Sequence, residues 1–321
     1  MIKQKTSNRT RLIALVLIAI LTGIIYQFIN IDMKFFDYAM YIRTPKLIAM
    51  FIAAFCIGTA SIVFQSIIRN RIVTPCLLGM NSLYILIHTS LVFILGSANI
   101  LVSNKYYSFI IDVVLMGVAG SFIYGMLFKK TKYNILYVLL AGTVLATFFT
   151  SISNTMTRVI DPNEYDKMLS NLVAGFDHVN SELILMAVGL IIITIIVFWK
   201  DIKLLDVITL GKNQAINLGV DYDKTVSHLL IGVTFFITIA TALVGPISFL
   251  GLIIANLSRE FFKTYRHSYL MLGSFLMGVI VLFGGQTLIE HIFGFGTQIS
   301  VFINLFGGLY FLYLVLKNKG V

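Results

Sequence analysis

The chain has 321 residues, of which 58% are hydrophobic and 12% charged, and its mean hydropathy is +0.93. This composition excludes an ordinary water-soluble domain or a disordered segment, because both carry a larger share of polar and charged residues. The formal net charge is +10, yet the basic residues lie in short segments between apolar runs and not on one water-facing surface that would bind nucleic acid. We expect a polytopic membrane protein with no nucleic-acid partner.

Ten apolar runs follow one another along the chain, without Pro-rich or Gly/Ser-rich linkers between them. Continuous runs indicate helices, since a transmembrane barrel shows short alternating segments. The sequence therefore predicts an all-α protein with a single transmembrane domain over residues 1–321. The expected spans are 12–30, 47–68, 76–97, 107–128, 134–153, 183–199, 225–244, 247–262, 268–289 and 298–316.

The distribution of Lys and Arg predicts the orientation. With the N-terminus in the cytoplasm, 18 of the 24 basic residues fall on the cytoplasmic side. The positive-inside rule then places both termini in the cytoplasm, and we expect a multi-pass protein of a bacterial plasma membrane. The first span has no small-residue cleavage site after it, so we expect it to be retained. The basic residues left outside are Lys34, Arg43, Lys46, Lys105, Arg158 and Lys167.

Two expected spans are interrupted in a similar way. The second begins near RTPK (43–46) and ends in RNRIVTPCLLG (69–79), while the eighth begins at Gly245-Pro246 and stops at Arg259 after about three turns. Interruptions at corresponding places in halves of opposite direction predict an inverted repeat, spans 2–5 against spans 7–10. The alternative is that Gly and Pro are simply tolerated in membrane helices. Small-residue pairs, Ala54 with Gly58 and Ser121 with Gly125, predict helix packing.

The polar segment 200–224 is expected to hold a short amphipathic helix outside the membrane. Asp206 or Thr209 could cap it, and Gly219 offers a left-handed stop. The alternative is a plain connector whose apolar side rests on the bilayer. Leu210, Gln214, Ala215 and Leu218 fall on one stripe of this helix, which would face outward, between the cap at Asp206 and the stop at Gly219.

Motifs for catalysis and for bound cofactors are missing. The only Gly-Lys pair, Gly211-Lys212, lacks the remaining residues of a phosphate-binding loop, so another chain would have to bind any ATP that is used. Cys56, Cys76 and five scattered His residues have no metal-ligand spacing. We expect no cofactor and no enzymatic activity in this chain.

The sequence resembles a known family in three separated motifs. RTPKLIAMFIAAFCIGTASIVFQSIIRNRIVTPCLLGMNS, LGKNQAINLGVDYDK and GPISFLGLIIANLSRE are similar to the permease subunits of iron-siderophore and cobalamin ABC importers. The resemblance implies ten spans, a homologous second permease in a homo- or heterodimer, two cytoplasmic ATP-binding subunits and an extracytoplasmic substrate-binding protein. It also implies that the helix in segment 206–219 docks into the ATPase. IIANLSREFFKTYRH and FINLFGGLYFLYL are most similar to the subgroup for catecholate-type siderophores such as petrobactin or anguibactin.

The resemblance also implies the docking residues for the binding protein. Arg43 and Lys46 match a basic pair that would meet acidic residues of that protein. Ala255-Asn256 departs from the Pro-His that is common in the family, and GGQTLIEHIFGF (284–295) departs from an expected Asp and Arg. The third basic contact would then be His291. The alternative role for Arg43 and Lys46 is that of basic side chains that extend to the bilayer interface and anchor the helix there.

A ferric siderophore needs a path that is polar enough to admit water but that binds the cargo too weakly to prevent its release. Six polar residues on the repeat spans could line it, although each could instead bond across packed helices. They are Gln65, Asn81, Ser82, Thr143, Ser151 and Asn154.

Two readings from other classes remain open, an ion-coupled secondary transporter and an intramembrane enzyme. An ion-coupled secondary transporter would need an acid buried within a span. Glu290 is the best candidate but is expected near the outer surface, and Asp112 lies about two turns from an outer end, where an interfacial role is expected. His88 is the other ionisable residue in an apolar span. An intramembrane enzyme would need a catalytic constellation, and an importer of cobalamin or haem would use the same fold.

Overall fold

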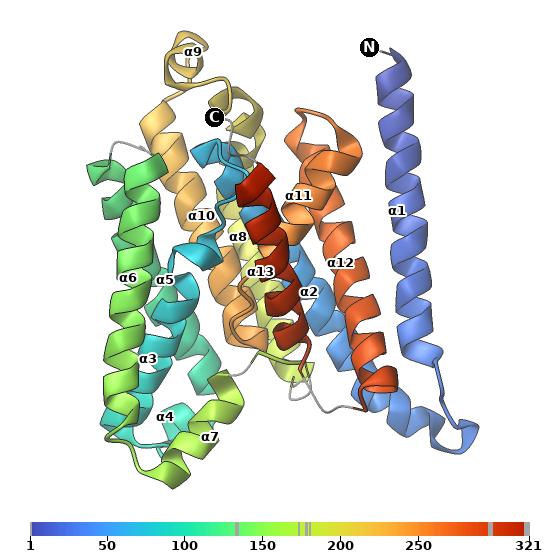
Figure 1. The fold of residues 1–321 in the computed structure, drawn as a ribbon, viewed down its shortest axis with the longest axis vertical. Coiled ribbons are helices and arrows are strands. Elements are labelled where there is room, and N and C mark those ends of the chain that lie inside the picture. Colours follow the sequence, from blue (N-terminus) through green and yellow to red (C-terminus); the bar gives the residue numbers. More distant parts are fainter. Residues whose placement is uncertain are drawn as a thin grey trace.

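The computed structural model describes residues 2–131, 135–172, 174–176, 179, 181–294 and 298–317, which form helices and no strand. Each expected span overlaps one main helix, although the third, 76–97, also takes in a short 3-10 helix before its main helix begins (Figure 1). These helices are α1 (Ile2–Phe28), α2 (Phe36–Ile68), α3 (Met80–Leu95), α5 (Lys105–Lys130), α6 (Ile135–Thr157), α8 (Ser181–Ile208), α10 (Tyr222–Val244), α11 (Leu250–Phe262), α12 (His267–Ile292) and α13 (Ile299–Lys317). Shorter helices connect them: η1 (Met33–Phe35), η2 (Pro75–Leu78), α4 (Ile100–Ser103), α7 (Pro162–Leu172) and α9 (Lys212–Asn217).

Eight helices of the described part of the chain are long and apolar enough to cross a membrane. α3 is apolar as well but has only 16 residues, and α11 has 13. The chain is therefore an all-α, multi-pass membrane protein. The start of α1, the end of α13 and the short helix α9 lie at the same end of the molecule, opposite α4 and α7 (Figure 1).

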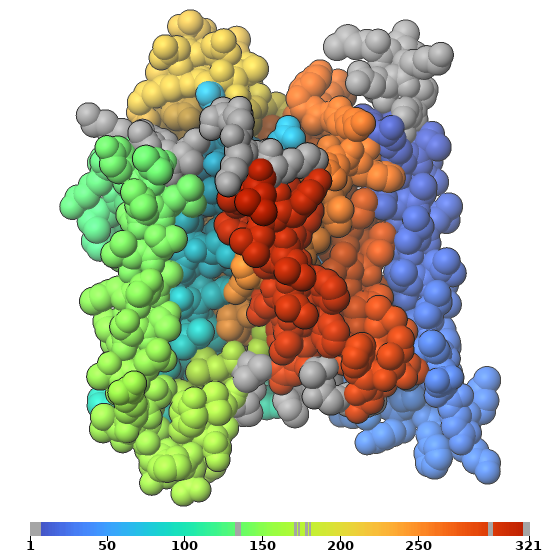
Figure 2. Space-filling model, viewed as in Figure 1, coloured from blue at the N-terminus to red at the C-terminus, as the bar shows by residue number. Residues whose placement is uncertain are grey.

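The long helices differ in how deeply they lie inside the molecule. α2 and α10 lie in the middle, with α1 and α6 at opposite edges (Figure 1). On one face α6 and α13 are prominent, and atoms of the η2–α3 segment are visible between them (Figure 2). The two middle helices supply the largest share of the core, whereas α6 and α13 leave apolar and polar side chains uncovered.

Close packing of α2 against α12 depends on small residues. A Cβ atom on Gly58 would lie 2.8 Å from Ser274 Oγ, and one on Gly278 would lie 2.9 Å from Ala54 Cβ. Without a hydrophobic force between helices in lipid, such close approach supplies the packing energy. The packing predicted for Ala54 and Gly58 is confirmed. The prediction for Gly125 is wrong, because nothing lies within 4 Å of a Cβ atom placed there.

The helices of the two expected repeat units match in order. α2 and α10 are the most buried long apolar helices, with 78% and 72% of their most apolar 18-residue stretches buried. The next helix of each unit is short, α3 in one and α11 in the other. The last helices, α6 and α13, are each only 22% buried over the same length. This agreement supports the predicted inverted repeat.

The short eighth span begins after a non-helical segment that separates it from α10. α10 ends at Val244, and Gly245 has φ +83°, which favours glycine. A Cβ atom on Gly245 would also lie 2.6 Å from Ala174 Cα, so a side chain does not fit. α11 then runs from Leu250 to Phe262 and ends where Lys263 adopts φ +45°. The prediction of a broken helix is confirmed.

Three helices extend well beyond their expected ends. α1 begins at Ile2 and not near residue 12. α2 begins at Phe36 and not near residue 47, so RTPK lies inside it with Pro45 within the helix. Proline removes one backbone donor, and the helix tolerates this loss as membrane helices often do. α8 continues to Ile208, past the expected end at residue 199, and takes in part of the segment that we expected to be a loop.

Candidate translocation and docking sites

α6 carries an exposed row of polar side chains. Thr143, Thr147, Thr150 and Asn154 recur at intervals of three or four residues, so they share one face of the helix. All four are exposed on the single chain, and no charged residue occurs in Ile135–Thr157. Polar groups are unfavourable in hydrocarbon. This face therefore suits contact with water or with another protein better than contact with lipid.

The threonine hydroxyls of this polar row are partly satisfied inside the helix. Thr147 Oγ1 donates to the carbonyl oxygen of Thr143 at 2.9 Å, and Thr150 Oγ1 donates to that of Ala146 at 2.8 Å. The hydroxyl oxygens still offer acceptors to solvent. Such a surface can be wetted without strong donors directed at a solute, as a path that must release its cargo requires.

Four of the six expected path residues belong to this region. Thr143, Ser151 and Asn154 are exposed on α6, and Ser82 of α3 is half-buried beside it, 3.2 Å from Thr150 Oγ1. Thr147 and Thr150 were not predicted from the sequence, although the helical spacing from Thr143 to Asn154 puts both on the same face. Their role as a path remains a prediction.

The other two expected path residues lie in the protein interior. Gln65 is 1% exposed, and its Nε2 donates to the carbonyl oxygen of Arg71 at 2.9 Å. Asn81 is 7% exposed, and its Nδ2 donates to Ser248 Oγ at 3.0 Å. Both amides hold the breaks before α3 and α11 to neighbouring elements. Both are buried in the single chain, although Gln65 also lines a cavity at the α9 end, and their role in a path remains a prediction.

Lys46 was expected on the outer rim, but the structure buries it. It is 8% exposed, and its Nζ lies 3.8 Å from Glu290 Oε1 on α12. The same carboxylate oxygen accepts from Gln286 Nε2 at 2.9 Å and from Tyr26 OH at 3.3 Å. A carboxylate on a helix packed against α2 thus neutralises the lysine inside the protein. Lys46 serves the contact between α1, α2 and α12, and an exposed docking contact is not available to it here.

Arg43 is half-buried and caps a helix end. Its Nη1 donates to the carbonyl oxygens of Tyr26, Gln27 and Ile29 at 3.2, 3.1 and 2.9 Å. These are among the unsatisfied carbonyls at the end of α1, where a cation is also favoured by the helix dipole. His291 follows Glu290 at the same end and is half-buried. Docking of a binding protein at Arg43 and His291 remains a prediction.

The expected exterior helix exists as α9, and it presents apolar side chains outward. Leu210, Ile216 and Leu218 are 53%, 52% and 62% exposed. Ala215 is fully buried, so it belongs to the inner side of the helix and not to the outward stripe. Gly219 has φ +81°, which confirms the left-handed stop. Ile216 was not predicted as an outward residue.

The start of α9 differs from the expectation. Its N-cap is Gly211, with no side-chain cap, and neither Asp206 nor Thr209 has that role. Asp206 lies inside α8, where its carboxylate accepts from the backbone N–H of His267 at 3.0 Å and also contacts His267 Nδ1. Gln214 is exposed on α9. Asp206 therefore holds α8 to α12 next to the exterior helix.

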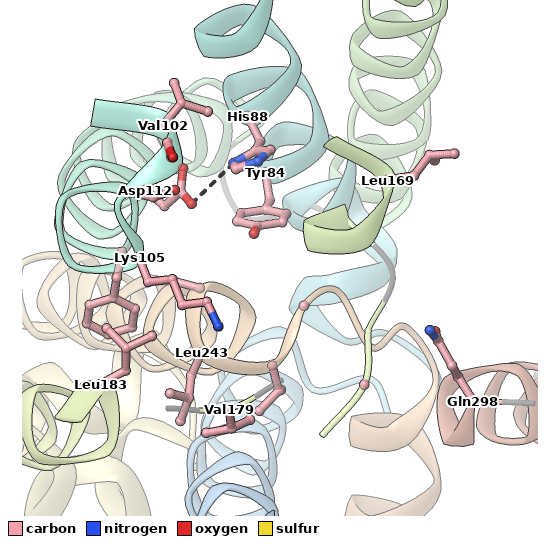
Figure 3. A pocket seen from close by; sticks show the side chains of 17 residues that line it. Tyr84, His88, Val102, Lys105, Asp112, Leu169, Val179, Leu183, Leu243 and Gln298 are labelled. Atoms are coloured by element: carbon pink, nitrogen blue, oxygen red, sulfur yellow. Dashed lines mark ion pairs between the residues drawn. The ribbon is translucent and has the colours of Figure 1, made fainter. Parts of the chain in front are cut away.

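A polar cavity of about 460 Å³ lies at the opposite end, between α3, α5 and the end of α10 (Figure 3). His88 and Asp112 meet in its wall, with Nδ1 3.4 Å from Oδ2, and they are 1% and 3% exposed. Tyr84 stacks on the imidazole ring with centroids 5.9 Å apart. Asp112 is thus buried and paired, which differs from the interfacial role that we expected. Lys105 extends into the same cavity (Figure 3).

We predict that His88 and Asp112 depend on each other for stability. His88→Leu leaves a buried carboxylate without its partner, a change that costs about 3–5 kcal/mol in comparable pairs. His88→Leu/Asp112→Leu removes both polar groups and should cost less. Thermal unfolding of the purified protein should therefore give a lower melting temperature for the single variant than for the double variant. A double variant that melts lowest would show that the two residues stabilise the protein independently.

Comparison with known proteins gives a consistent result over almost the whole chain. The model of the FecCD transport family matches residues 12–317. The chain belongs to the FecCD transport family. Among FecCD relatives, the petrobactin import system permease protein YclO of Bacillus subtilis is 43% identical over 306 residues, covering 94% of this chain and 97% of that protein. The petrobactin import system permease protein FatC of Bacillus anthracis is 34% identical, covering 87% of this chain and 79% of that protein.

A solved structure shares the FecCD fold. It is the structure of a transporter assigned to the metal-chelate type of ABC transporters, in an inward-facing conformation. The two structures agree with a TM-score of 0.79, covering 97% of this chain and 99% of the other, at 20% sequence identity. At that identity the likeness concerns the fold. It confirms the helical arrangement on which the polar row of α6, the outward face of α9 and the α2–α12 contact depend.

Proposed function

We propose that this FecCD protein is a membrane subunit of an ABC importer that moves a ferric siderophore, of the catecholate type, into the cytoplasm. The 43% identity to a petrobactin import permease over nearly the full length carries the proposal. The exposed polar row of α6 gives the cargo a surface, and α9 gives a separate ATPase a place to bind. The chain supplies the route, while a partner supplies ATP hydrolysis.

The polar row favours assembly with a second permease. On a single chain the row would face lipid, which offers no partner to the amide of Asn154 or to the remaining acceptor sites of the threonine hydroxyls. A homologous permease, either a second copy or a different chain, would enclose the row between two subunits and create a water-filled path. Thr143, Ser151 and Asn154 would line this path, together with Thr147 and Thr150. Ser82 would support it from α3.

The two ends of the molecule suit different partners. Two ATP-binding subunits would bind at the end with α9, where Leu210, Ile216 and Leu218 are exposed. The positive-inside distribution supports a cytoplasmic location for this end and for both termini, with the protein in the plasma membrane of a bacterium. An extracytoplasmic substrate-binding protein would dock at the other end, near Arg43 and His291.

An ion-coupled mechanism has less support. Both buried acids within the apolar helices have internal partners: Asp112 faces His88 and Glu290 faces Lys46. Paired acids are less available to a coupling ion than an unpaired acid within the membrane would be.

Growth of a deletion strain on a panel of iron sources tests the cargo. With iron supplied only as ferric petrobactin or another ferric catecholate, the strain should grow poorly and recover when the gene is restored. Growth on a hydroxamate chelate or on haem, and uptake of cobalamin, should stay unchanged. Loss of growth on haem alone, or loss of cobalamin uptake alone, would assign the permease to that cargo in place of a siderophore.

A further inference from the structure

A second cavity, which we call the arginine cavity, opens at the α9 end of the molecule. It measures about 460 Å³ and is lined by four basic residues, Arg69, Arg71, Arg259 and Lys263. They come from the end of α2, the loop after it and the end of α11. Cations on the cytoplasmic side are expected from the positive-inside rule. That rule does not explain why four of these cations line the same cavity.

The four cations lack carboxylate partners within the described part of the chain. Arg259 is half-buried, and it donates to Ser66 Oγ at 2.8 Å and to Gln65 Oε1 at 3.3 Å, both uncharged. Arg69, Arg71 and Lys263 are exposed and make no ion pair with a described residue. Like charges that face one cavity repel each other, so an anion that enters it lowers the electrostatic free energy.

Asp206 lies beside this cavity, but its carboxylate already has a hydrogen-bond partner. Asp206 contacts His267, which lines the cavity, through both the backbone N–H and Nδ1. His267 Nε2 in turn lies 2.9 Å from Ser66 Oγ. The carboxylate of Asp206 is therefore directed to α12 and does not balance the arginines.

The cavity is held in a fixed shape. The carbonyl oxygen of Arg71 accepts from Gln65 Nε2 and from Asn256 Nδ2, each at 2.9 Å. These two amides come from α2 and α11, so the loop that carries Arg71 is fastened on both sides. Two guanidinium groups held on such a frame suit a carboxylate, because the planar fork of arginine can donate two parallel hydrogen bonds to it.

The arginine cavity adjoins the exterior helix. Thr209, two residues before the N-cap of α9, lines the cavity. The guanidinium of Arg69 lies against Gly211, where an added Cβ atom would be 2.5 Å from Nη2. Figure 1 shows α9 and the turn between α11 and α12 at the same end of the molecule. A protein that covers α9 would therefore also reach the cavity.

From this geometry we infer that the arginine cavity receives an acidic side chain of the ATP-hydrolysing subunit that docks on α9. The inference rests on the proposed function and adds the chemistry of the contact. α9 supplies the apolar part of the interface, and the cavity supplies a charged part that fixes the orientation of the partner.

The test compares the affinity of purified permease assemblies for the ATPase subunit. The cavity variant, Arg71→Gln/Lys263→Gln, removes two exposed charges of the cavity. The control variant, Lys129→Gln/Lys130→Gln, removes two exposed charges at the C-terminal end of α5. The cavity variant should bind the ATPase about tenfold more weakly at low salt, and the difference should shrink as salt increases. The control should remain within about twofold of the parent.

A second measurement uses the unaltered complex and does not depend on the folding of a variant. Carbodiimide coupling, which joins an amine directly to a carboxylate, should link Lys263 to an Asp or Glu of the ATPase. Unchanged affinity together with no such link would overturn the inference. So would a cavity variant that loses co-purified anionic phospholipid but binds the ATPase normally, because the cavity would then hold a lipid headgroup.

A third variant separates this inference from the proposed function. If Leu218→Glu on α9 weakens ATPase binding while the cavity variant does not, only the role of the cavity is wrong. If neither variant weakens it, the proposed coupling to an ATPase at this end is wrong as well.

Discussion

Leu218→Glu is expected to abolish ATP-driven transport while the protein still inserts and folds. Leu218 is 62% exposed on α9, so the new charge disturbs no interior contact and acts only on a partner that covers the helix. Burying an unpaired charge at the centre of an interface costs about 2 kcal/mol or more, or roughly thirtyfold in affinity. Co-purification of the ATPase and transport should therefore decrease together, as measured at equal amounts of membrane-inserted protein.

Two controls make this result specific. Leu101→Glu places the same charge on an exposed leucine of α4 at the opposite end, and ATPase binding should remain at the parental level. Ala215→Glu places it on the fully buried side of α9 and should lower the yield of folded protein. If Leu218→Glu keeps both transport and ATPase binding, α9 is a plain connector that rests on the bilayer.

The second large effect is expected on the polar row of α6. Thr147→Val/Asn154→Leu removes polar atoms from two exposed positions and keeps similar volumes. An apolar row wets poorly, so entry of a charged chelate should become costly. We expect uptake to decrease at least tenfold, which corresponds to about 1.4 kcal/mol. Assembly with the ATPase should remain normal, and this separates a blocked path from a lost partner.

The control for this experiment lies on the same helix. Val144 is 67% exposed beside the polar row, and Val144→Leu changes volume without changing polarity. It should transport like the parent. If the α6 double variant transports at the parental rate, the polar row is a packing surface and the cargo passes elsewhere.

Apolar runs and helical spacing were sufficient to predict the helices but not their contacts. All ten expected spans overlap helices, because each membrane helix satisfies its own backbone. The polar row could be predicted only in part. Helical spacing puts Thr147 and Thr150 on the same face as Thr143, but nothing in the sequence shows that this face of α6 is exposed. Spacing along one helix does not reveal which face its neighbours cover.

Contacts between distant segments account for the remaining differences. Lys46 looked exposed in the sequence because its partner, Glu290, comes from α12. His88 and Asp112 looked independent because nothing in either helix specifies how α3 packs on α5. Ala215 fitted an outward stripe by spacing, yet packing buries it. Such pairings depend on tertiary structure, and a local pattern cannot supply them.

Uptake by reconstituted vesicles tests the central claim most directly. The permease, with its homologous partner subunit, the ATPase and the binding protein, is placed in vesicles, and entry of radiolabelled iron as ferric petrobactin is measured. We expect uptake that requires ATP on the cytoplasmic side and the binding protein on the other, with no response to a proton or sodium gradient. Uptake that follows an ion gradient and continues without ATPase or ATP would contradict the assignment of this chain as an ABC importer permease.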